Sequence, residues 1–182
     1  MSDRMINVLP CMREMCGTTV NLFGWDLTGT VSYSFNQQGF RSTVDYDFDP
    51  DYVFFGCSLV FGVGVDQDKI FPSQFERSWN CGLAGWYNNQ DIFDSIQNFE
   101  TAVSRSCRKF VCWIDRDNDV AHRYAQQLSA KGYLQFFCGA PAELENCYAM
   151  PPHIDTDPSG THMGAQSHRM FAKLLCALFD RS

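Results

Sequence analysis

The sequence predicts an α/β protein: a three-layer α/β/α sandwich in which helices cover both faces of a central parallel sheet. Continuous apolar runs at 52–57, 109–114 and 133–138 are typical of strands that are buried on both faces. Segments whose apolar residues have helical spacing alternate with these runs. Strands that alternate with helices form right-handed βαβ units, and such units build a parallel sheet.

The strands are expected in the following order along the chain. Residues 1–50 are rich in turns and are expected to form short strands or a loop that wraps the core, ending at an Asp-Pro step. The run 52–57 opens the main body, and a shorter strand is expected at 79–85, where it ends in a glycine turn. All of residues 1–182 are expected to form a single domain.

Helices are expected from the pattern of apolar residues at 68–79, 88–105, 119–130 and 167–179. In the first of them, Pro72 fits only near the first turn. The third ends at a Lys-Gly pair that suits a C-cap. The last places Met170, Leu174 and Leu178 on one face.

The charge and the apolar pattern narrow the range of partners. The formal net charge is −7 at pH 7, and phosphate backbones need basic surface, so we expect no nucleic-acid partner. No apolar run approaches the roughly 18 residues of a membrane span, and the N-terminus lacks the apolar core of a signal peptide. We therefore expect a cytoplasmic protein that binds no membrane, with a viral or leaderless secreted protein as the alternative.

The chain has nine cysteines, and none of them forms a C-x-x-C pair. The spacing of a zinc knuckle is therefore absent. Several cysteines, among them Cys112 and Cys138, lie in apolar runs and are expected to be small buried hydrophobes. This use of cysteine favours a reducing compartment. We expect neither a metal ion nor another cofactor.

A serine, Ser58, follows the first long strand in "YVFFGCS". In open parallel sheets the carboxyl ends of the strands form the ligand crevice, and a turn at that point exposes a hydroxyl for nucleophilic attack. Ser58 needs a base. Among the four histidines, His162 lies in a loop rich in Gly, Ser and Pro just before the last helix, from which it can reach the crevice. His153 is the second choice.

These motifs resemble the blocks of the SGNH (GDSL-type) hydrolases. The Gly-Asp-Ser block and its glycine-bearing turn correspond to "GCSLVFGVGV", and the block that leads from Asn to a glycine corresponds to "NCGLAG". The Gly-x-Asn-Asp block corresponds to "RDND", and the histidine block before the final helix corresponds to "HMGAQSH". Upstream, "NQQGFRS" is similar to an N-x-x-G-F-R stretch of one branch of the family. The resemblance spans roughly residues 33–180, with the blocks in the family's order.

The resemblance implies a flavodoxin-like fold and a serine esterase. Ser58 would attack the ester, and His162 would take its proton and later give it to the leaving alcohol. The Ser58 N–H, the Gly85 N–H and the Asn118 side-chain amide would form the oxyanion hole. The substrate would be a small acyl ester, such as an O-acetyl group linked to a carbohydrate.

Cys57 replaces the aspartate of the first block. A thiol braces the turn less well than a carboxylate, because it is a weaker hydrogen-bonding group. Adjacent residues at a strand end point in opposite directions, so Cys57 is expected to face the core if Ser58 faces the crevice. The rival hypothesis is that Cys57 is itself the nucleophile of a thiol-dependent acyltransferase.

Ser159 occupies the position three residues before His162, where the family has an aspartate. The nearest carboxylate is Asp157, which we expect to orient the imidazole because the Pro-Ser-Gly turn between them lets it reach back. Two alternatives stay open. Asp155 could take this role, or a backbone carbonyl could orient the ring and leave a Ser-His dyad.

Two residues are candidates for substrate binding. Arg116 replaces the glycine of the third block and could supply a cation for an acidic acyl or sugar group, or pair with a neighbouring aspartate in solvent. Trp86, together with Tyr87 and Phe61, could stack on a sugar or line an acyl pocket, or belong to the core. The aspartates missing from the first and last blocks leave a second function open, a catalytically weak SGNH-fold module that binds a glycan or a protein.

Overall fold

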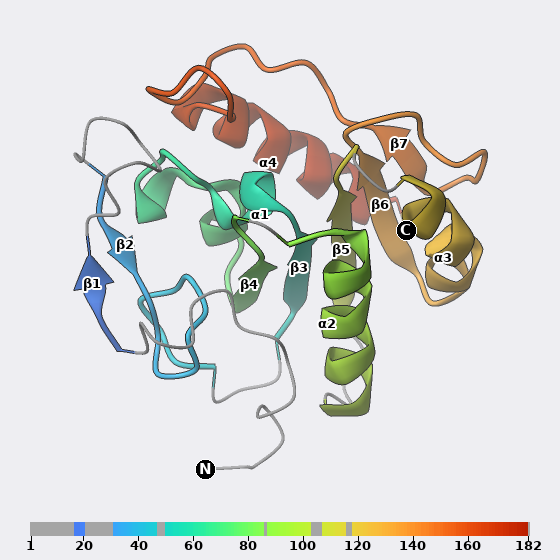
Figure 1. Cartoon of the computed structure of the whole chain (residues 1–182), viewed down its shortest axis with the longest axis horizontal. Coiled ribbons are helices and arrows are strands. Elements are labelled where there is room, and N and C mark those ends of the chain that lie inside the picture. The colour runs from blue at the N-terminus through green and yellow to red at the C-terminus, as the bar shows by residue number, and fades with distance from the viewer. Residues whose placement is uncertain are drawn as a thin grey trace.

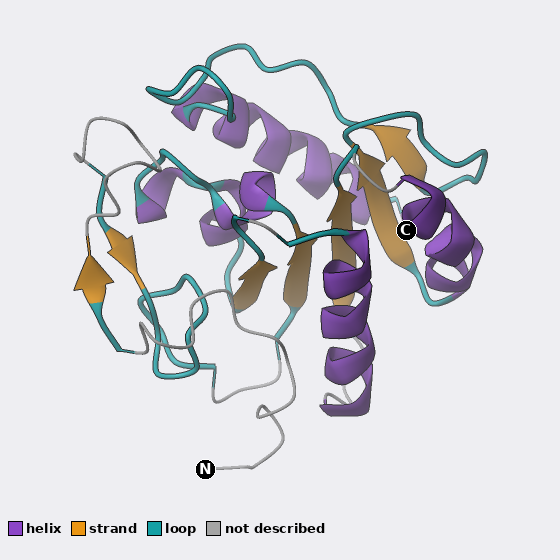
Figure 2. Cartoon of the chain, viewed as in Figure 1, coloured by secondary structure: helices purple, strands orange, loops and turns teal. Residues whose placement is uncertain are grey.

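The computed structural model describes most of the chain, namely residues 17–20, 31–46, 50–85, 87–102, 107–115 and 118–181. A five-stranded parallel sheet lies at the centre, with helices packed against it, and a small two-stranded sheet stands apart from it (Figure 1, Figure 2). The predicted α/β class is confirmed.

The strands of the large sheet are all parallel and have the order β4-β3-β5-β6-β7. Their bounds are Tyr52–Gly56 (β3), Ser78–Gly82 (β4), Arg108–Trp113 (β5), Tyr133–Phe137 (β6) and Cys147–Ala149 (β7). Along the chain β3 comes first, and it pairs with β4 on one side and β5 on the other. The winding therefore reverses at β3, and in open parallel sheets a crevice forms at the carboxyl end of such a strand.

The longer helices are α2 (Asn89–Ala102), α3 (Asn118–Ala130) and α4 (Ala165–Phe179). Neighbouring side chains of β3 show that α2 and α4 cover opposite faces of the sheet. The Phe54 ring packs against Phe179 of α4, with centroids 6.5 Å apart, whereas the Phe55 ring packs against Phe99 of α2 at 5.3 Å. This two-sided cover explains why β3 is a continuous apolar run.

The predicted helix at 68–79 is wrong. Two short 3₁₀ turns, η3 (Gln67–Lys69) and η4 (Phe71–Gln74), occupy this part of the chain, and β4 already begins at Ser78. The proline at position 72 has no N–H to continue a helical ladder. Arg77, with φ of 52°, turns the chain into the strand.

Helix α4 does not bury the face that carries Met170 and Leu174. Phe171, Leu175 and Phe179 lie in the core, whereas Met170 and Leu174 are 36% and 38% exposed. The aromatic side chains of β5 and β6 select this face, because the ring of Phe171 packs edge-on against rings from both strands.

The described part of the N-terminal region packs on the core. Strands β1 (Thr19–Val20) and β2 (Tyr33–Ser34) form the antiparallel two-stranded sheet. The buried members of this region that join the main apolar cluster are Val31, Tyr33, Phe35, Phe40 and Tyr46. Residues 1–16 and 21–30 lie outside the described residues.

No helix within the described ranges has both the length and the apolar composition to cross a membrane. No disulfide joins the cysteines of these ranges. Cys57, Cys81 and Cys112 are buried, as expected of small hydrophobes, but Cys138 is exposed.

His168 of α4 is a buried packing residue. Its Nδ1 accepts a hydrogen bond from the Phe71 N–H at 3.2 Å, and the two rings stack with centroids 5.6 Å apart. Burial, reinforced by the positive charge of Arg41, lowers the pKa of His168 from 6.5 to about 3. The imidazole is therefore neutral in the folded protein at neutral pH.

Acid should destabilise the protein through His168. Between pH 6.5 and 3 the unfolded chain binds a proton that the folded chain refuses, so the free energy of unfolding falls as pH decreases, by up to about 1.4 kcal/mol per pH unit. His168→Asn keeps an acceptor for the Phe71 N–H and should remove this slope in urea titrations between pH 6.5 and 4.5. The exposed His122→Asn should keep it. An unchanged slope in His168→Asn would contradict the assignment.

Candidate active site

Ser58 lies where β3 turns into a short helix, α1 (Ser58–Phe61). Gly56, the last residue of the strand, has φ of +147°, and a Cβ there would lie 2.6 Å from the Cys112 carbonyl oxygen. Only glycine fits this close approach. Cys57 is the N-cap, and Ser58 opens the helix, so the N–H of Ser58 has no acceptor within the helix.

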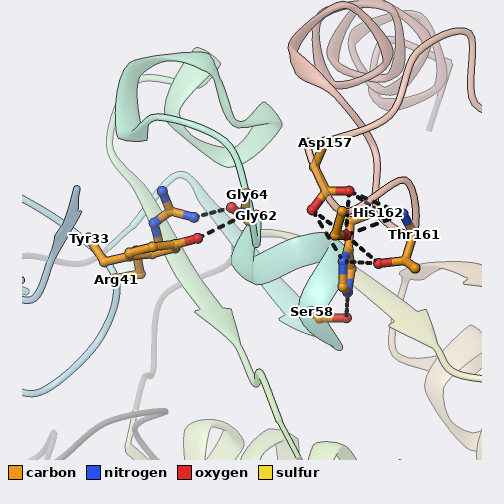
Figure 3. Close-up of polar contacts among 9 residues, drawn as sticks. Tyr33, Arg41, Ser58, Gly62, Gly64, Asp157, Thr161 and His162 are labelled. Atoms are coloured by element: carbon orange, nitrogen blue, oxygen red, sulfur yellow. Dashed lines mark hydrogen bonds and ion pairs between the residues drawn. The ribbon is translucent and has the colours of Figure 1, made fainter. Parts of the chain in front are cut away.

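Ser58 and His162 are hydrogen-bonded across the site. The Ser58 Oγ is 3.0 Å from the His162 Nε2, although 104 residues separate them along the chain. His162 comes from the loop that precedes α4, as Figure 3 shows. This is the geometry in which an imidazole can take the proton of a serine hydroxyl.

The Asp157 carboxylate organises the loop that carries His162. Its side chain has no exposed surface, and it accepts hydrogen bonds from the His162 N–H at 3.0 Å, the Thr161 N–H at 3.2 Å and the Ser159 hydroxyl at 2.8 Å. The Asp157 N–H in turn donates to the His162 carbonyl oxygen at 3.0 Å. These bonds close the segment 157–162 into a tight turn.

A chain of hydroxyl groups links the imidazole to this carboxylate. The His162 Nδ1 is 3.0 Å from the Thr161 Oγ1, which is 2.6 Å from the Ser159 Oγ, which donates to Asp157. The direct distance from Nδ1 to the carboxylate is longer, 3.7 Å. Each hydroxyl has one proton and the carboxylate can only accept, so only one direction places a proton in every contact of the chain: Nδ1–H to Thr161, Thr161 to Ser159, and Ser159 to Asp157. This direction leaves Nε2 free to accept the Ser58 proton.

Asp157 remains ionised within this network. Burial alone would raise its pKa, but the hydrogen bonds from the His162 N–H and the Ser159 hydroxyl outweigh burial and lower the pKa below its usual value. A negative charge is therefore held behind the imidazole at neutral pH.

Asp155, the alternative partner, is engaged elsewhere. Its carboxylate accepts the N–H groups of Gln166 at 2.9 Å and Ser167 at 2.6 Å, in the first turn of α4. An acidic side chain at this place satisfies the unpaired donors of the helix N-terminus. Asp155 thus holds the helix, and Asp157 holds the histidine loop.

The turn after α1 packs against the Asp157 side chain. Gly64 has φ of +76°, and a Cβ at this position would collide with the Asp157 carboxylate. The Gly64 N–H donates to the Tyr33 hydroxyl at 2.8 Å. Arg41, which is 1% exposed, donates to the carbonyl oxygens of Phe61 (2.9 Å) at the end of α1 and of Gly62 and Val65 in the turn. Figure 3 shows the contact with Gly62. The turn is therefore fixed from the side opposite to Asp157.

Sequence reasoning did not find this role of Arg41. Its guanidinium lies 4.5 Å from the Tyr33 ring centroid and 5.1 Å from that of Phe61, which is cation–π geometry. The only signal in the sequence was its place in the "NQQGFRS" stretch.

A cavity of about 590 Å³ opens over the serine and the histidine. One wall is the segment 150–153, which includes His153, and Asp115 and Leu59 also line the cavity. His153, the second choice of base, thus lies near the site, but the hydrogen bond to Ser58 comes from His162.

The three oxyanion donors, the Ser58 N–H among them, stay predictions. Gly85 is exposed, with φ of +97° and open space around it. Asn118 opens α3, where its Nδ2 donates to Asp115 at 3.3 Å and its Oδ1 is buried with no partner among the described residues. Neither residue lines the cavity over Ser58.

The predicted substrate-binding residues Arg116 and Trp86 lie outside the described residues. Of the aromatic side chains grouped with Trp86, Phe61 is fully buried and Tyr87 packs partly buried against the core. Phe61 is therefore a core residue and not part of an acyl pocket.

Three thiols cluster beside Ser58, an arrangement that the sequence spacing did not reveal. The Sγ atoms of Cys57, Cys112 and Cys138 all lie within 4.8 Å of one another. Hydrogen bonds from the other two thiols lower the pKa of Cys57 well below its ordinary value, despite burial. Cys57 is buried beside its two partners, but it also lines the same cavity as Ser58.

Comparisons with protein-family models, with curated proteins and with solved structures find no match to this chain.

The contact between Gly64 and Asp157 can be tested by a matched pair of substitutions. Gly64 and Gly132 have nearly equal φ, +76° and +75°, but the space around Gly132 is open. Alanine at either site should cost about 1–2 kcal/mol of unfolding free energy through backbone strain. Gly64→Ala should cost about 1–3 kcal/mol more, because its methyl group displaces the carboxylate. Equal losses in urea unfolding would show that Asp157 does not rest on this turn.

Proposed function

We propose that this protein is a serine esterase of the SGNH type that acts on small acyl esters. The observation that carries the proposal is the 3.0 Å hydrogen bond from the Ser58 hydroxyl to the His162 Nε2, at the base of a cavity and backed by a buried carboxylate. A nucleophile, a base and an orienting acid in this relation are the machinery of acyl transfer.

The reaction follows from this geometry. His162 removes the Ser58 proton as the Oγ attacks the ester carbonyl, and a tetrahedral intermediate forms with negative charge on its oxygen. The Ser58 N–H, with the Gly85 N–H and the Asn118 amide as the resemblance implies, would stabilise this charge. The intermediate then collapses, and the imidazolium gives its proton to the leaving alcohol. A water activated by the same histidine hydrolyses the acyl-enzyme.

Asp157 would stabilise the imidazolium that forms during each step. Its charge reaches the ring through the hydroxyls of Ser159 and Thr161, as well as across 3.7 Å of space. This network supports a functional substitute for the family's Asp-x-x-His block. Ser159 stands where the family has the aspartate, and its hydroxyl donates a hydrogen bond to the carboxylate of Asp157, two residues earlier. Because a carboxylate is still linked to the imidazole through these hydroxyls, the alternative of an inactive binding module is weaker.

The topology supports membership of the SGNH fold. In order of appearance, the five parallel strands are arranged 2-1-3-4-5, which is the flavodoxin-like order of doubly wound sheets. Ser58 follows the strand at which the winding reverses, where such proteins bind their ligands.

The cavity suits a small substrate. About 590 Å³ lies within the range of small-molecule sites. Its walls combine the apolar side chains of Met150, Pro151 and Pro152 with the carboxylate of Asp115. This carboxylate and the net charge of −7 disfavour anionic substrates, so an O-acetyl group on a neutral carbohydrate is the substrate class we favour. Nucleic acid and membrane are not proposed as partners, and a reducing cytoplasm is the proposed location.

A fluorophosphonate probe and a short-chain aryl ester test the proposal. Wild type should be labelled and should hydrolyse the ester. Ser58→Ala should abolish labelling, and Ser58→Ala and His162→Ala should each lower kcat by roughly 10⁴–10⁶-fold, because the members of such a unit act together.

Cys57→Ser separates the serine from the thiol mechanism. It should keep labelling at Ser58, and its kcat should fall far less than that of Ser58→Ala, with folding checked by circular dichroism. A wild type that neither reacts with the probe nor hydrolyses the ester would contradict the esterase. Loss of hydrolysis in folded Cys57→Ser, with Ser58→Ala active, would assign the reaction to the thiol.

A further inference from the structure

The three-thiol cluster (Cys57, Cys112 and Cys138) is built by the tertiary fold. Cys57 follows β3, Cys112 lies within β5 and Cys138 follows β6. Strand pairing places Gly56 opposite Cys112, and the Cys138 N–H donates to the Trp113 carbonyl oxygen at 3.0 Å. Three neighbouring strands thus bring one sulfur each to the same point at the carboxyl edge of the sheet.

The spacing of the sulfurs matches that of thiolates on one metal ion. Sulfurs at ~2.3 Å from a tetrahedral Zn²⁺ lie about 3.8 Å apart. The Cys112 and Cys138 Sγ atoms are 3.9 Å apart, and no pair in the cluster exceeds 4.8 Å. Among the described residues, these three cysteines form the group of three or more potential ligands whose donor atoms lie close enough together to hold a metal ion.

The cluster is accessible from the cavity. Cys57 and Cys138 both line it, and so does Asp115. A small hydrated cation can therefore reach two of the sulfurs from solvent. Three protein ligands leave the fourth position of a tetrahedral ion directed to water or to a nearby oxygen donor.

We propose that Cys57, Cys112 and Cys138 bind a single thiophilic metal ion of the Zn²⁺ type, directly behind the Ser58 turn. Thiolates are the ligands that select such soft ions. Each thiol loses its proton to solvent as its sulfur–metal bond forms, so three thiolates and one divalent ion carry a net charge of −1. Magnesium and calcium, which require oxygen ligands, would not bind here.

Bound metal would brace the turn that presents the nucleophile. Cys57 is the N-cap of α1 and is bonded to Ser58. Its fixation to β5 and to the end of β6 would supply the support that the aspartate of the first block gives in the resembling family. The site does not depend on the esterase proposal, because metal binding is measured without any substrate.

Titration with Cd²⁺ under reducing, oxygen-free conditions tests this site. The protein for the titration is the full chain with Cys11→Ser and Cys16→Ser, which removes the cysteines outside the described residues. We expect one Cd²⁺ per chain by equilibrium dialysis, a cadmium–thiolate charge-transfer absorption that saturates at one equivalent, and a higher Tm. Zn²⁺ should compete for the same site.

Two matched pairs of variants locate the metal. Cys112→Ser and Cys81→Ser both replace a buried strand cysteine, and Cys138→Ser and Cys176→Ser both replace an exposed one. Cys112→Ser and Cys138→Ser should each weaken Cd²⁺ binding at least tenfold, whereas Cys81→Ser and Cys176→Ser should leave the Cd²⁺ affinity unchanged. Circular dichroism verifies that each variant is folded.

Three results would overturn the proposal. The first is the absence of saturable Cd²⁺ binding, and the second is equal Cd²⁺ affinity in Cys138→Ser and Cys176→Ser. The third is a disulfide within the cluster that, after its reduction, leaves a protein unable to bind Cd²⁺. The last result would identify the cluster as a redox pair with a neighbouring thiol.

Discussion

The Asp157 side chain joins the parts of the site that are far apart in sequence. It has no exposed surface, and it accepts hydrogen bonds from the Ser159 hydroxyl and from two backbone N–H groups. It closes the loop that carries His162, and it rests against Gly64 in the turn that follows the Ser58 helix. One buried charge therefore sets the distance between the serine and the imidazole. Its burial is tolerated because the carboxylate oxygens accept hydrogen bonds from two backbone N–H groups and a hydroxyl.

Ser58 has its own constraint at the end of β3. Gly56 allows the strand to approach the Cys112 carbonyl oxygen and then turn sharply into α1. Aromatic packing on both faces of β3 fixes the strand, and Arg41 fixes the turn beyond the helix through its carbonyl oxygens. The chain is thus fixed on both sides of Ser58, and the Ser58 hydroxyl faces the His162 Nε2 at 3.0 Å.

The sequence predicts those features that depend on local pattern. The apolar runs of β3, β5 and β6 mark buried strands, and the strand end at Ser58 and the loop at His162 lie where the pattern places them. Contacts between distant segments leave no such pattern. The thiol cluster unites cysteines from three strands, and the face of α4 is chosen by aromatic rings of the sheet. Neither could be read from spacing along the chain.

The role of Asp157 is tested most directly by the rate at which a fluorophosphonate modifies Ser58, followed by mass spectrometry of the intact protein. Asp157→Asn and Asp155→Asn make the same change two residues apart, and both carboxylates accept backbone N–H groups. We predict that Asp157→Asn slows the modification by about 10²–10⁴-fold, whereas Asp155→Asn stays within a few-fold of wild type. Equal rates in the two variants would contradict this role of Asp157.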